Sequence, residues 1–372
     1  MVCKPAIIAD MAKLKIAVYS IALNEIKHVE RYAEATKHAD YVIVADTGST
    51  DGTQEALRKL GIQVYDISVK PWRFDVARNT ALALVPQDAD VCVILDMDEV
   101  LDKNFIKHVR NKWQPSWTNA WITMETAPNK WIRDRLHSRH GWRWKYPCHE
   151  VQVWYGEGEP ILGDIQQAII SHQPDNTKSR GQYLELLKLS VKEYPTDPRM
   201  WAYMCREYYF HNQWENCIDA ANKMIDLPNG WDVERAAVCR WAGQSCYNLE
   251  RHDEATNWYD RGVQILPTEG EPWYGIAVDA YRKKDWPKVL DASVRILEMP
   301  RSVHHCHESE VWDWKAFDLA SIAAWELKQP EEALVFAEHA LNGNSPESER
   351  IKRNVDFFRK ALSELRPRNK ST

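Results

Sequence analysis

An apolar run at residues 91–95, VCVIL, predicts a buried strand, and acidic residues follow it directly in DMDEVLD. Residues i and i+2 leaving a strand point to the same side, so Asp96 and Asp98 can present their carboxylates together. Mg²⁺ and Mn²⁺ take a few protein oxygens and complete their shell with water and phosphate oxygens. The pattern predicts that Asp98 binds such a cation while Asp96 reaches a ribose or a metal-bound water. Asp102 is expected to cap the helix after it.

The elements that must position these acids alternate in type along the first half of the chain. Strands are predicted at residues 15–23, 40–48, 62–69 and 91–96, and helices at 28–39, 51–61 and 74–85. This alternation is typical of βαβ units and a parallel sheet, where ligands bind at the carboxyl ends of strands. The polar clusters Asn24–Glu25, Asp46–Ser49 and Asp96–Glu99 follow predicted strands, so we expect them to converge on one edge.

The chain after residue 178 reads as helix after helix. Four segments align on the positions Cys217, Ala255, Val289 and Ala333, with spacings of 38, 34 and 44 that bracket the 34-residue tetratricopeptide period. We expect about four degenerate helical hairpins followed by a terminal helix at residues 350–362. Ten of the 18 tryptophans fall in this half, and their spacing favours a role in its core. The predicted domains are residues 1–178 and 179–372.

Composition excludes several classes of function. A net charge of −6 gives no global attraction to nucleic acid or to an anionic membrane. The sequence shows no secretory signal and no run of apolar residues long enough to span a bilayer. The eight cysteines contain no C-x-x-C pair, and most sit in apolar patterns as reduced, buried thiols do. A cytoplasmic location is therefore expected.

Four motifs occur in a fixed order: SIALNE, VIVADTGSTDGT, WRFDVARNTAL and VILDMDEVL, with HE and ISHQPD after them. Together they resemble the GT-A domain of family-2 glycosyltransferases, in the subgroup with C-terminal tetratricopeptide-like repeats. The resemblance implies an α/β GT-A domain (Rossmann-like, with a mainly parallel sheet) followed by an all-α tetratricopeptide-like solenoid. It also implies transfer of a sugar from a nucleotide-sugar donor, UDP-linked in our interpretation, with Mn²⁺ or Mg²⁺ as cofactor.

The resemblance further implies roles for individual residues. Expected donor contacts are Ala22, Leu23, Asn24, Glu25, Asp46, Gly48, Trp72, Arg78, Asn79, Asp96 and Met97. Expected metal ligands are Asp96, Asp98 and His172. Alternatives remain open at several of these positions. Arg78 can instead have a structural role by bonding the loop at 96–99, Ser49 and Asp51 suit turn chemistry, and a histidine after an apolar strand is often only a strand-end residue.

The same resemblance places a catalytic base in PCHEVQVW, where Glu150 is the only acid between Asp134 and Glu157. His149 either orients Glu150 or is itself the base. The segment 113–154 interleaves tryptophans with basic residues, a pattern that can bind phosphates and stack on sugars or bases. We expect the acceptor there, and the alternative is a twisted β-meander with a solvated basic face.

The leading hypothesis is an inverting, metal-dependent glycosyltransferase. It would act on a hydroxyl or thiol of a macromolecular acceptor, a peptide or a saccharide, held by residues 113–154 and the helical repeats. A transferase acting on modified bases of DNA is a rival, disfavoured by the net acidity. The other rival is a non-catalytic tetratricopeptide-like binding protein with a decayed transferase domain.

Overall fold

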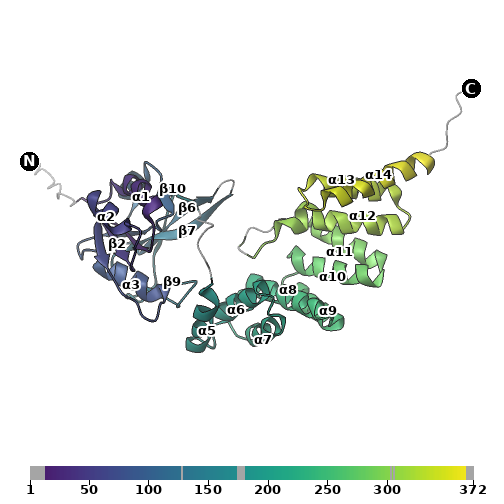
Figure 1. The fold of residues 1–372 in the computed structure, drawn as a ribbon, viewed down its shortest axis with the longest axis horizontal. Helices are drawn as coiled ribbons and strands as arrows, with labels where there is room; N and C mark the ends of the chain where they lie inside the picture. Colours follow the sequence, from purple (N-terminus) through teal and green to yellow (C-terminus); the bar gives the residue numbers. More distant parts are fainter. Residues whose placement is uncertain (1–12, 127–128, 174–180, 302–303, 305, 366–372) are drawn as a thin grey trace, which may run out of the picture. The chain divides into compact units, whose positions relative to one another are not determined.

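The computed structural model describes residues 13–126, 129–173, 181–301, 304 and 306–365. The chain divides into two compact units, Met1–Gln182 and Tyr183–Thr372. The predicted boundary between residues 178 and 179 lies outside the described residues. In the described part of the chain, the first unit combines strands and helices, and the second contains helices (Figure 1).

The first unit is built around an eight-stranded sheet. Its strands are β1 (Ile16–Ala22), β2 (Tyr41–Asp46), β3 (Gln63–Asp66), β4 (Val91–Ile94), β5 (Glu99–Leu101), β6 (Asn119–Thr126), β7 (Asn129–Ser138) and β10 (Leu162–His172). A separate pair consists of β8 (Trp142–Lys145) and β9 (Val151–Trp154). The helices are η1 (Ile26–His28), α1 (Val29–Thr36), α2 (Thr53–Lys59), α3 (Phe74–Leu84) and α4 (Phe105–Lys112).

The sheet has the strand order β3-β2-β1-β4-β7-β6-β10-β5. The first four strands in that order are parallel, and β6 and β10 are also parallel. Strand β7 is antiparallel to both of its neighbours, and β5 is antiparallel to β10. The predicted Rossmann-like, mainly parallel sheet is therefore confirmed, with four of its strands extending it beyond the βαβ units.

Both faces of this sheet are buried at its central strands β1, β2 and β4, which explains the continuous apolar runs of those strands. Side chains alternate between the faces. Ile16 and Val18 of β1 join the core cluster that includes residues of α1, α2 and α4, while Ala17 and Tyr19 join the cluster that includes residues of α3. Because helices cover both faces, the carboxyl ends of the strands remain as the free edge where loops can build a site.

Two strand pairings in the second part of the sheet determine which loops meet. In the antiparallel pair of β5 and β10, Leu101 lies opposite Ile170 and Glu99 lies opposite His172. The pairing joins the end of β10 to the acidic turn that follows β4. The Gln173 N–H also donates to the Asp98 carbonyl at 3.0 Å.

One sequence expectation in this region is wrong. The helix after the acidic turn is α4, and its N-cap residue is Asn104, so Asp102 does not cap it. Asp102 instead accepts from the Asn104 N–H at 2.7 Å and from the Ile169 N–H at 3.1 Å. Its carboxylate thus anchors the start of α4 to strand β10. A strand partner so distant in sequence cannot be read from the local pattern.

The second unit is a series of antiparallel helical hairpins. Its helices are α5 (Tyr183–Glu193), α6 (Pro198–Phe210), α7 (Trp214–Ile225), α8 (Asp232–Asn248), α9 (His252–Ile265), α10 (Gly270–Lys283), α11 (Trp286–Glu298), η2 (Val311–Lys315), α12 (Ala316–Glu326), α13 (Pro330–Asn342) and α14 (Ser348–Leu365). Four hairpins pair α6 with α7, α8 with α9, α10 with α11 and α12 with α13. Figure 1 shows these hairpins following one another along the unit. The predicted helical repeats and terminal helix are confirmed.

The four positions on which the repeats align all lie on the second helix of a hairpin. Cys217, Ala255, Val289 and Ala333 are at most 1% exposed. Small or apolar side chains there let the paired helices approach closely. No helix in the described part of the chain is long and apolar enough to cross a membrane.

Candidate active site

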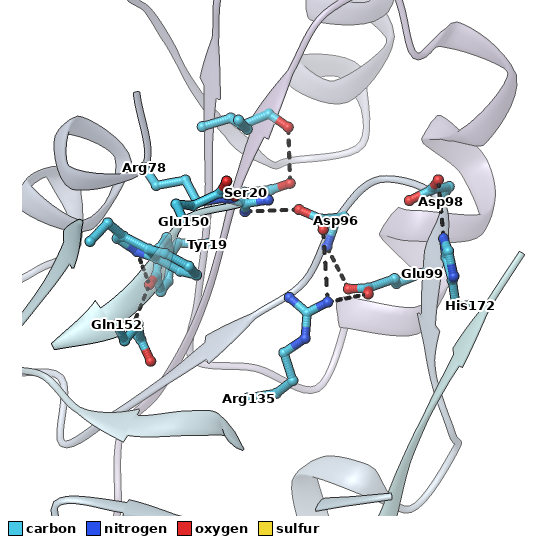
Figure 2. Close-up of polar contacts among 12 residues, drawn as sticks. Tyr19, Ser20, Arg78, Asp96, Asp98, Glu99, Arg135, Glu150, Gln152 and His172 are labelled. Carbon is cyan, nitrogen blue, oxygen red and sulfur yellow. Dashed lines mark hydrogen bonds and ion pairs between the residues drawn. The ribbon is translucent and has the colours of Figure 1, made fainter. Parts of the chain in front are cut away.

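The loops after β1, β2 and β4 gather polar side chains at the carboxyl edge of the sheet. Arg78 of α3 lies among them, with its guanidinium between two carboxylates. Its Nη1 donates to Asp96 Oδ1 at 2.9 Å, and its Nε donates to Glu150 Oε1 at 2.6 Å (Figure 2). The predicted donor acid and the predicted base therefore share one cation.

Burial and charge oppose each other in this group. Burial alone would raise the pKa of Asp96, but the charges of Arg78 and Arg135 outweigh it and hold that pKa well below its ordinary value. Burial by itself would lower the pKa of Arg78. Asp96 and Glu150 raise that pKa by more, so the guanidinium stays charged. Its cation also lies over the Trp144 ring, 4.9 Å from the centroid. The arrangement is a fixed positive centre flanked by anions.

Arg135 and Glu99 belong to the same network, and sequence reasoning did not single them out as site residues. Arg135 Nη2 lies 2.6 Å from Glu99 Oε1 and 3.9 Å from Asp96 Oδ2. Glu99 Oε2 accepts from the Asp96 N–H at 2.9 Å, which closes the acidic turn. The antiparallel pairing of β7 with β4 brings Arg135 to this edge, because Leu136 lies opposite Val93. Burial raises the pKa of Glu99 despite the nearby arginine.

Asp98 faces His172, on the other side of Glu99 from Arg78 (Figure 2). The His172 Nε2 atom lies 3.6 Å from Asp98 Oδ2. The neighbouring Asp98 carboxylate raises the pKa of His172 above its usual value, against the effect of burial. Among the residues that the structure describes, no three His, Cys, Asp or Glu side chains gather closely enough to hold a metal. Asp98 and His172 thus form an ion pair, and Asp96 turns toward the arginines instead.

The loop that carries Glu150 has an unusual backbone. Tyr146 and His149 have φ values of 82° and 50°, in the left-handed region that favours glycine. Asn24, at the end of β1, has a φ of 55°. Strained backbone of this kind persists only where surrounding structure holds it, and it concentrates at functional sites. The loop presents the Glu150 side chain to Arg78, and His149 is half-buried beside it.

Asp46 lies at the edge but is fully buried. Its Oδ1 accepts from the N–H groups of Gly48 and Ser49 at 2.9 and 2.8 Å and from Gln54 Nε2 at 2.7 Å, and its Oδ2 accepts from Ser49 Oγ at 2.6 Å. The carboxylate organises its own turn, so a direct contact with a ribose would require some of these bonds to break. Asn24 joins the same loop by accepting from the Thr50 N–H at 2.8 Å.

The other expected donor contacts lie in varied surroundings. Leu23 is 51% exposed, whereas Glu25 is buried and its N–H donates to Thr53 Oγ1 at 2.8 Å. Ala22 and Met97 are buried in the apolar core of the unit, so any donor contact would involve their backbone.

Trp72 and Asn79 pack against neighbouring elements. Trp72 is half-buried, with its ring edge-on to Phe74 at 5.2 Å between centroids. The side chain of Asn79 pairs with the backbone of Trp144, donating to its carbonyl and accepting from its N–H, each at 2.9 Å. Asn79 thus links α3 to β8, next to Arg78.

Most tryptophans of the segment 113–154 pack against neighbouring side chains. Trp113, Trp142 and Trp144 are at most 9% exposed, while Trp121 is 40% exposed. Strands β6 to β9 make up this segment, so it contains the twisted β-strands of the alternative interpretation. Basic side chains such as Arg143, whose guanidinium lies 5.6 Å from the Tyr155 ring centroid, remain exposed on its surface. An aromatic platform for an acceptor is thus limited to a few positions.

The fold and the edge define a class of protein: a Rossmann-like α/β domain with an acid–arginine site at the carboxyl ends of its strands, followed by helical repeats. The family follows from comparison. Residues 18–169 match the model of the family "Glycosyl transferase family 2". This part of the chain is therefore similar to glycosyl transferase family 2 domains, and the match runs from β1 into β10.

Comparison with solved structures finds helical-repeat proteins. The crystal structure of MamA aligns with a TM-score of 0.36 at 13% identity, over 45% of this chain and 89% of MamA. YrrB, described as a TPR protein with an unusual peptide-binding site, aligns with a TM-score of 0.39 at 15% identity, over 49% of this chain and 85% of YrrB. The APC/C hetero-tetramer Cut9-Hcn1 aligns with a TM-score of 0.40 at 11% identity, over 49% and 33% of the two chains. A comparison with curated proteins found no match.

Proposed function

We propose that this chain is an inverting, metal-dependent glycosyltransferase. It moves a sugar from a UDP-linked donor to a hydroxyl or thiol of a macromolecular acceptor, a peptide or a saccharide. The family-2 match over residues 18–169 supports glycosyl transfer in general. The observation that carries the finer proposal is the edge itself, where Arg78, Asp96 and Glu150 form one hydrogen-bonded group beside Asp98 and His172.

Asp98 and His172 suit a divalent cation. A carboxylate oxygen and an imidazole nitrogen that face each other provide two ligands, and Mg²⁺ or Mn²⁺ takes its remaining ligands from water and phosphate. When bound, the cation would neutralise charge on the diphosphate leaving group. Asp96, held by Arg78, is then left to face the donor as an acceptor of hydrogen bonds.

Glu150 has the chemistry of the base in this proposal. Its side chain is 13% exposed and is oriented by Arg78. In an inverting transfer, the acceptor oxygen or sulfur attacks the anomeric carbon from the face opposite the diphosphate, and its proton passes to the Glu150 carboxylate. His149 precedes Glu150 and is the second candidate for this role.

Calorimetric titration tests the donor and metal together. We expect UDP to bind the full chain in MnCl₂ more tightly than GDP does, and to lose affinity in excess EDTA. Asp98→Asn removes a charged metal ligand while keeping its size, so UDP affinity in MnCl₂ should fall by about 10–100-fold or more. Asp164→Asn is the matched control, since Asp164 is exposed on β10 and bonds Gln166.

Two results would contradict the proposal. UDP affinity that is equal in MnCl₂ and in EDTA would remove the metal from the site. No binding of any nucleotide by the wild-type chain would favour the rival interpretation, a binding protein whose transferase domain no longer works.

A further inference from the structure

The helical unit contains a cavity of about 250 Å³ that the proposed transfer reaction does not use. Its lining residues come mainly from the first helices of successive hairpins: Tyr209 of α6, Trp241 of α8 and Tyr274 of α10. Glu308 and Glu310, which precede η2, and Lys315, the last residue of η2, also line it. A single water occupies about 30 Å³ of liquid, so the cavity has room for a side chain.

Four aromatic rings line this cavity: Tyr209, Trp241, Tyr259 and Tyr274. Tyr259 is the exception among them, because it comes from α9, the second helix of its hairpin. It reaches the cavity between two glycines of neighbouring helices. A Cβ at Gly243 or Gly275 would lie 2.4 Å from an atom of the Tyr259 ring. The two glycines therefore make room for an aromatic side chain that also lines the cavity.

The lining of the cavity contains more carboxylates than cations. Two cations are each paired with a carboxylate: Arg240 with Glu308, and Lys315 with Glu310 at 2.8 Å. The remaining carboxylate is Glu271. Among the described residues, Glu271 forms no ion pair with a lysine or arginine, and it accepts the Glu308 N–H at 2.8 Å. The lining thus carries one surplus negative charge.

Glu271 is 4% exposed, and its burial raises its pKa. The nearest imidazole is that of His307, whose Nδ1 lies 3.7 Å from Glu271 Oε1. Burial lowers the pKa of His307, so this imidazole is neutral near pH 7 and does not balance the carboxylate. The charge of Arg240 opposes the effect of burial on the Glu271 pKa only in part, because Arg240 is paired with Glu308. A buried carboxylate with no cation of its own is costly, and an incoming cation would relieve that cost.

The helical half of the chain is negatively charged as a whole, like the lining of the cavity. Residues 1–182 contain 23 acidic and 23 basic residues, whereas residues 183–372 contain 31 acidic and 25 basic residues. The entire net charge of −6 therefore belongs to the half that contains the cavity. Such a surface attracts basic segments and repels acidic ones.

We propose that this cavity binds the lysine or arginine side chain of a peptide segment, and that the acceptor is recognised through this basic residue. Two of the rings already lie near cations of the lining, since the Arg240 guanidinium is 5.3 Å from the Trp241 ring centroid and Lys315 Nζ is 5.8 Å from that of Tyr274. In the proposal, Glu271 balances the charge of the incoming head, and the aromatic rings contact that head and its aliphatic stem. That the bound peptide is the acceptor rests on the proposed function, whereas binding of the side chain does not.

Fluorescence anisotropy with the full chain tests this without any donor. The probes are four pools of fluorescein-labelled nonapeptides with a central Lys, Arg, Gln or Glu and randomised neutral flanks. We expect the Lys and Arg pools to bind about tenfold more tightly than the Gln pool, a factor within the range for a cation between aromatic rings and a carboxylate. Glu271→Gln should reduce that preference to near unity. Glu331→Gln, the same charge change at an exposed position of α13, should keep it.

A second variant keeps the proposal testable if Glu271→Gln does not fold. Tyr274→Leu keeps an apolar side chain at a half-buried position but removes one aromatic face, so it should also reduce the preference. Equal binding of all four pools, or a preference that survives in Glu271→Gln and Tyr274→Leu, would overturn the proposal. Tighter binding of the Glu pool would do the same and would make Arg240 and Lys315 an anion site. UDP titration of the same wild-type preparation separates this outcome from failure of the proposed transferase function.

Discussion

At the scale of single residues, Arg78 explains most of the organisation of the site. A buried guanidinium that donates to two carboxylates fixes both in position, and removal of such a partner leaves uncompensated buried charge. Arginine suits this role better than lysine, because its planar fork bonds two acceptors at once. Any role of Arg78 in the reaction would therefore use the same contacts as the structural role expected for it from the sequence.

Glu150→Gln gives the first prediction at this scale. The amide keeps the shape of the side chain and can still accept from Arg78, but it is a far weaker proton acceptor than a carboxylate. We expect UDP and Mn²⁺ affinity to stay within about twofold and sugar turnover to fall by about 10²–10⁴-fold, the usual contribution of a general base. Donor turnover and UDP titration, measured on the same preparations, check this.

His149→Ala is the informative companion variant. If Glu150→Gln keeps its turnover and His149→Ala loses it, the base is His149. If both variants turn over normally, neither residue is the base.

His137 gives a prediction about pH and stability. This fully buried imidazole contacts Tyr19 Oη at 3.0 Å, and burial lowers its pKa to about 4. An unfolded histidine has a pKa near 6.5, so the unfolded state takes up a proton first as the pH falls. The stability that the neutral ring allows is complete above about pH 6.5 and is lost between there and about pH 4.

Between pH 7.5 and pH 5 we expect His137 to lower the free energy of unfolding of the α/β unit by about 2 kcal/mol. Hydrogen exchange of β7 amides, corrected for intrinsic rates, measures this. His137→Gln should remove that part of the pH dependence, and the exposed His140→Gln should retain it. An identical slope in the wild-type chain and in His137→Gln would contradict the assignment.

Sequence patterns located one edge of the site but not its interior. Asp96, Asp98 and Asn24 follow apolar strands closely enough for strand ends to be recognised, and βαβ alternation then implies that they meet. Arg135 sits in a stretch with several other basic residues, and only the antiparallel register of β7 distinguishes it. Asp46 and Met97 were expected at the donor, yet local turn bonding and core packing hold their side chains.

At the scale of elements, the contact of Tyr259 with two helices gives a prediction about packing. Alanine is a better helix former than glycine by about 1 kcal/mol, so Gly275→Ala would stabilise an isolated α10. In the folded unit the new methyl group would lie 2.4 Å from the Tyr259 ring, and overpacking of this kind costs about 1–3 kcal/mol. We expect Gly275→Ala to lower the urea midpoint of the helical signal in far-UV circular dichroism.

A double-mutant cycle isolates the cause. In a Tyr259→Ala background the clash is gone, and Gly275→Ala should become neutral or stabilising. Gly262→Ala, where a Cβ would come no closer than 3.1 Å to Pro272, should cost less than Gly275→Ala. Equal effects of Gly275→Ala in the two backgrounds would show that the ring is not the obstacle.

At the scale of the whole molecule, the two units have separate cores, and our proposals give each a ligand of its own. Residues 13–173 contain the edge that we propose binds UDP with a metal, so a ligand there stabilises the folded α/β unit by mass action, by about 2.7 kcal/mol at 100 times its Kd. We expect calorimetry of the full chain to show that UDP with MnCl₂ raises the unfolding temperature of the α/β unit more than that of the helical unit. A labelled peptide pool with central lysine should do the reverse.

Two variants assign the two transitions: Gly275→Ala, described above, and Arg78→Met, which leaves Asp96 and Glu150 without their shared cation. Gly275→Ala should lower the helical transition, and Arg78→Met should lower the other. An equal rise of both transitions with UDP would contradict the prediction.

The pairing of β5 with β10 has a consequence for how the protein is made. Asp98 directly precedes β5, the edge strand of the sheet. The hydrogen bonds between β5 and β10, the last strand of the sheet in the sequence, bring Asp98 to His172. When β1 to β4 and the acidic turn have left the ribosome, Asp96 and Asp98 are present but His172 has not yet emerged. During synthesis the pair of Asp98 and His172 cannot form until residue 172 has emerged, when every other strand of the sheet is already available. Assembly of that pair thus coincides with completion of the domain.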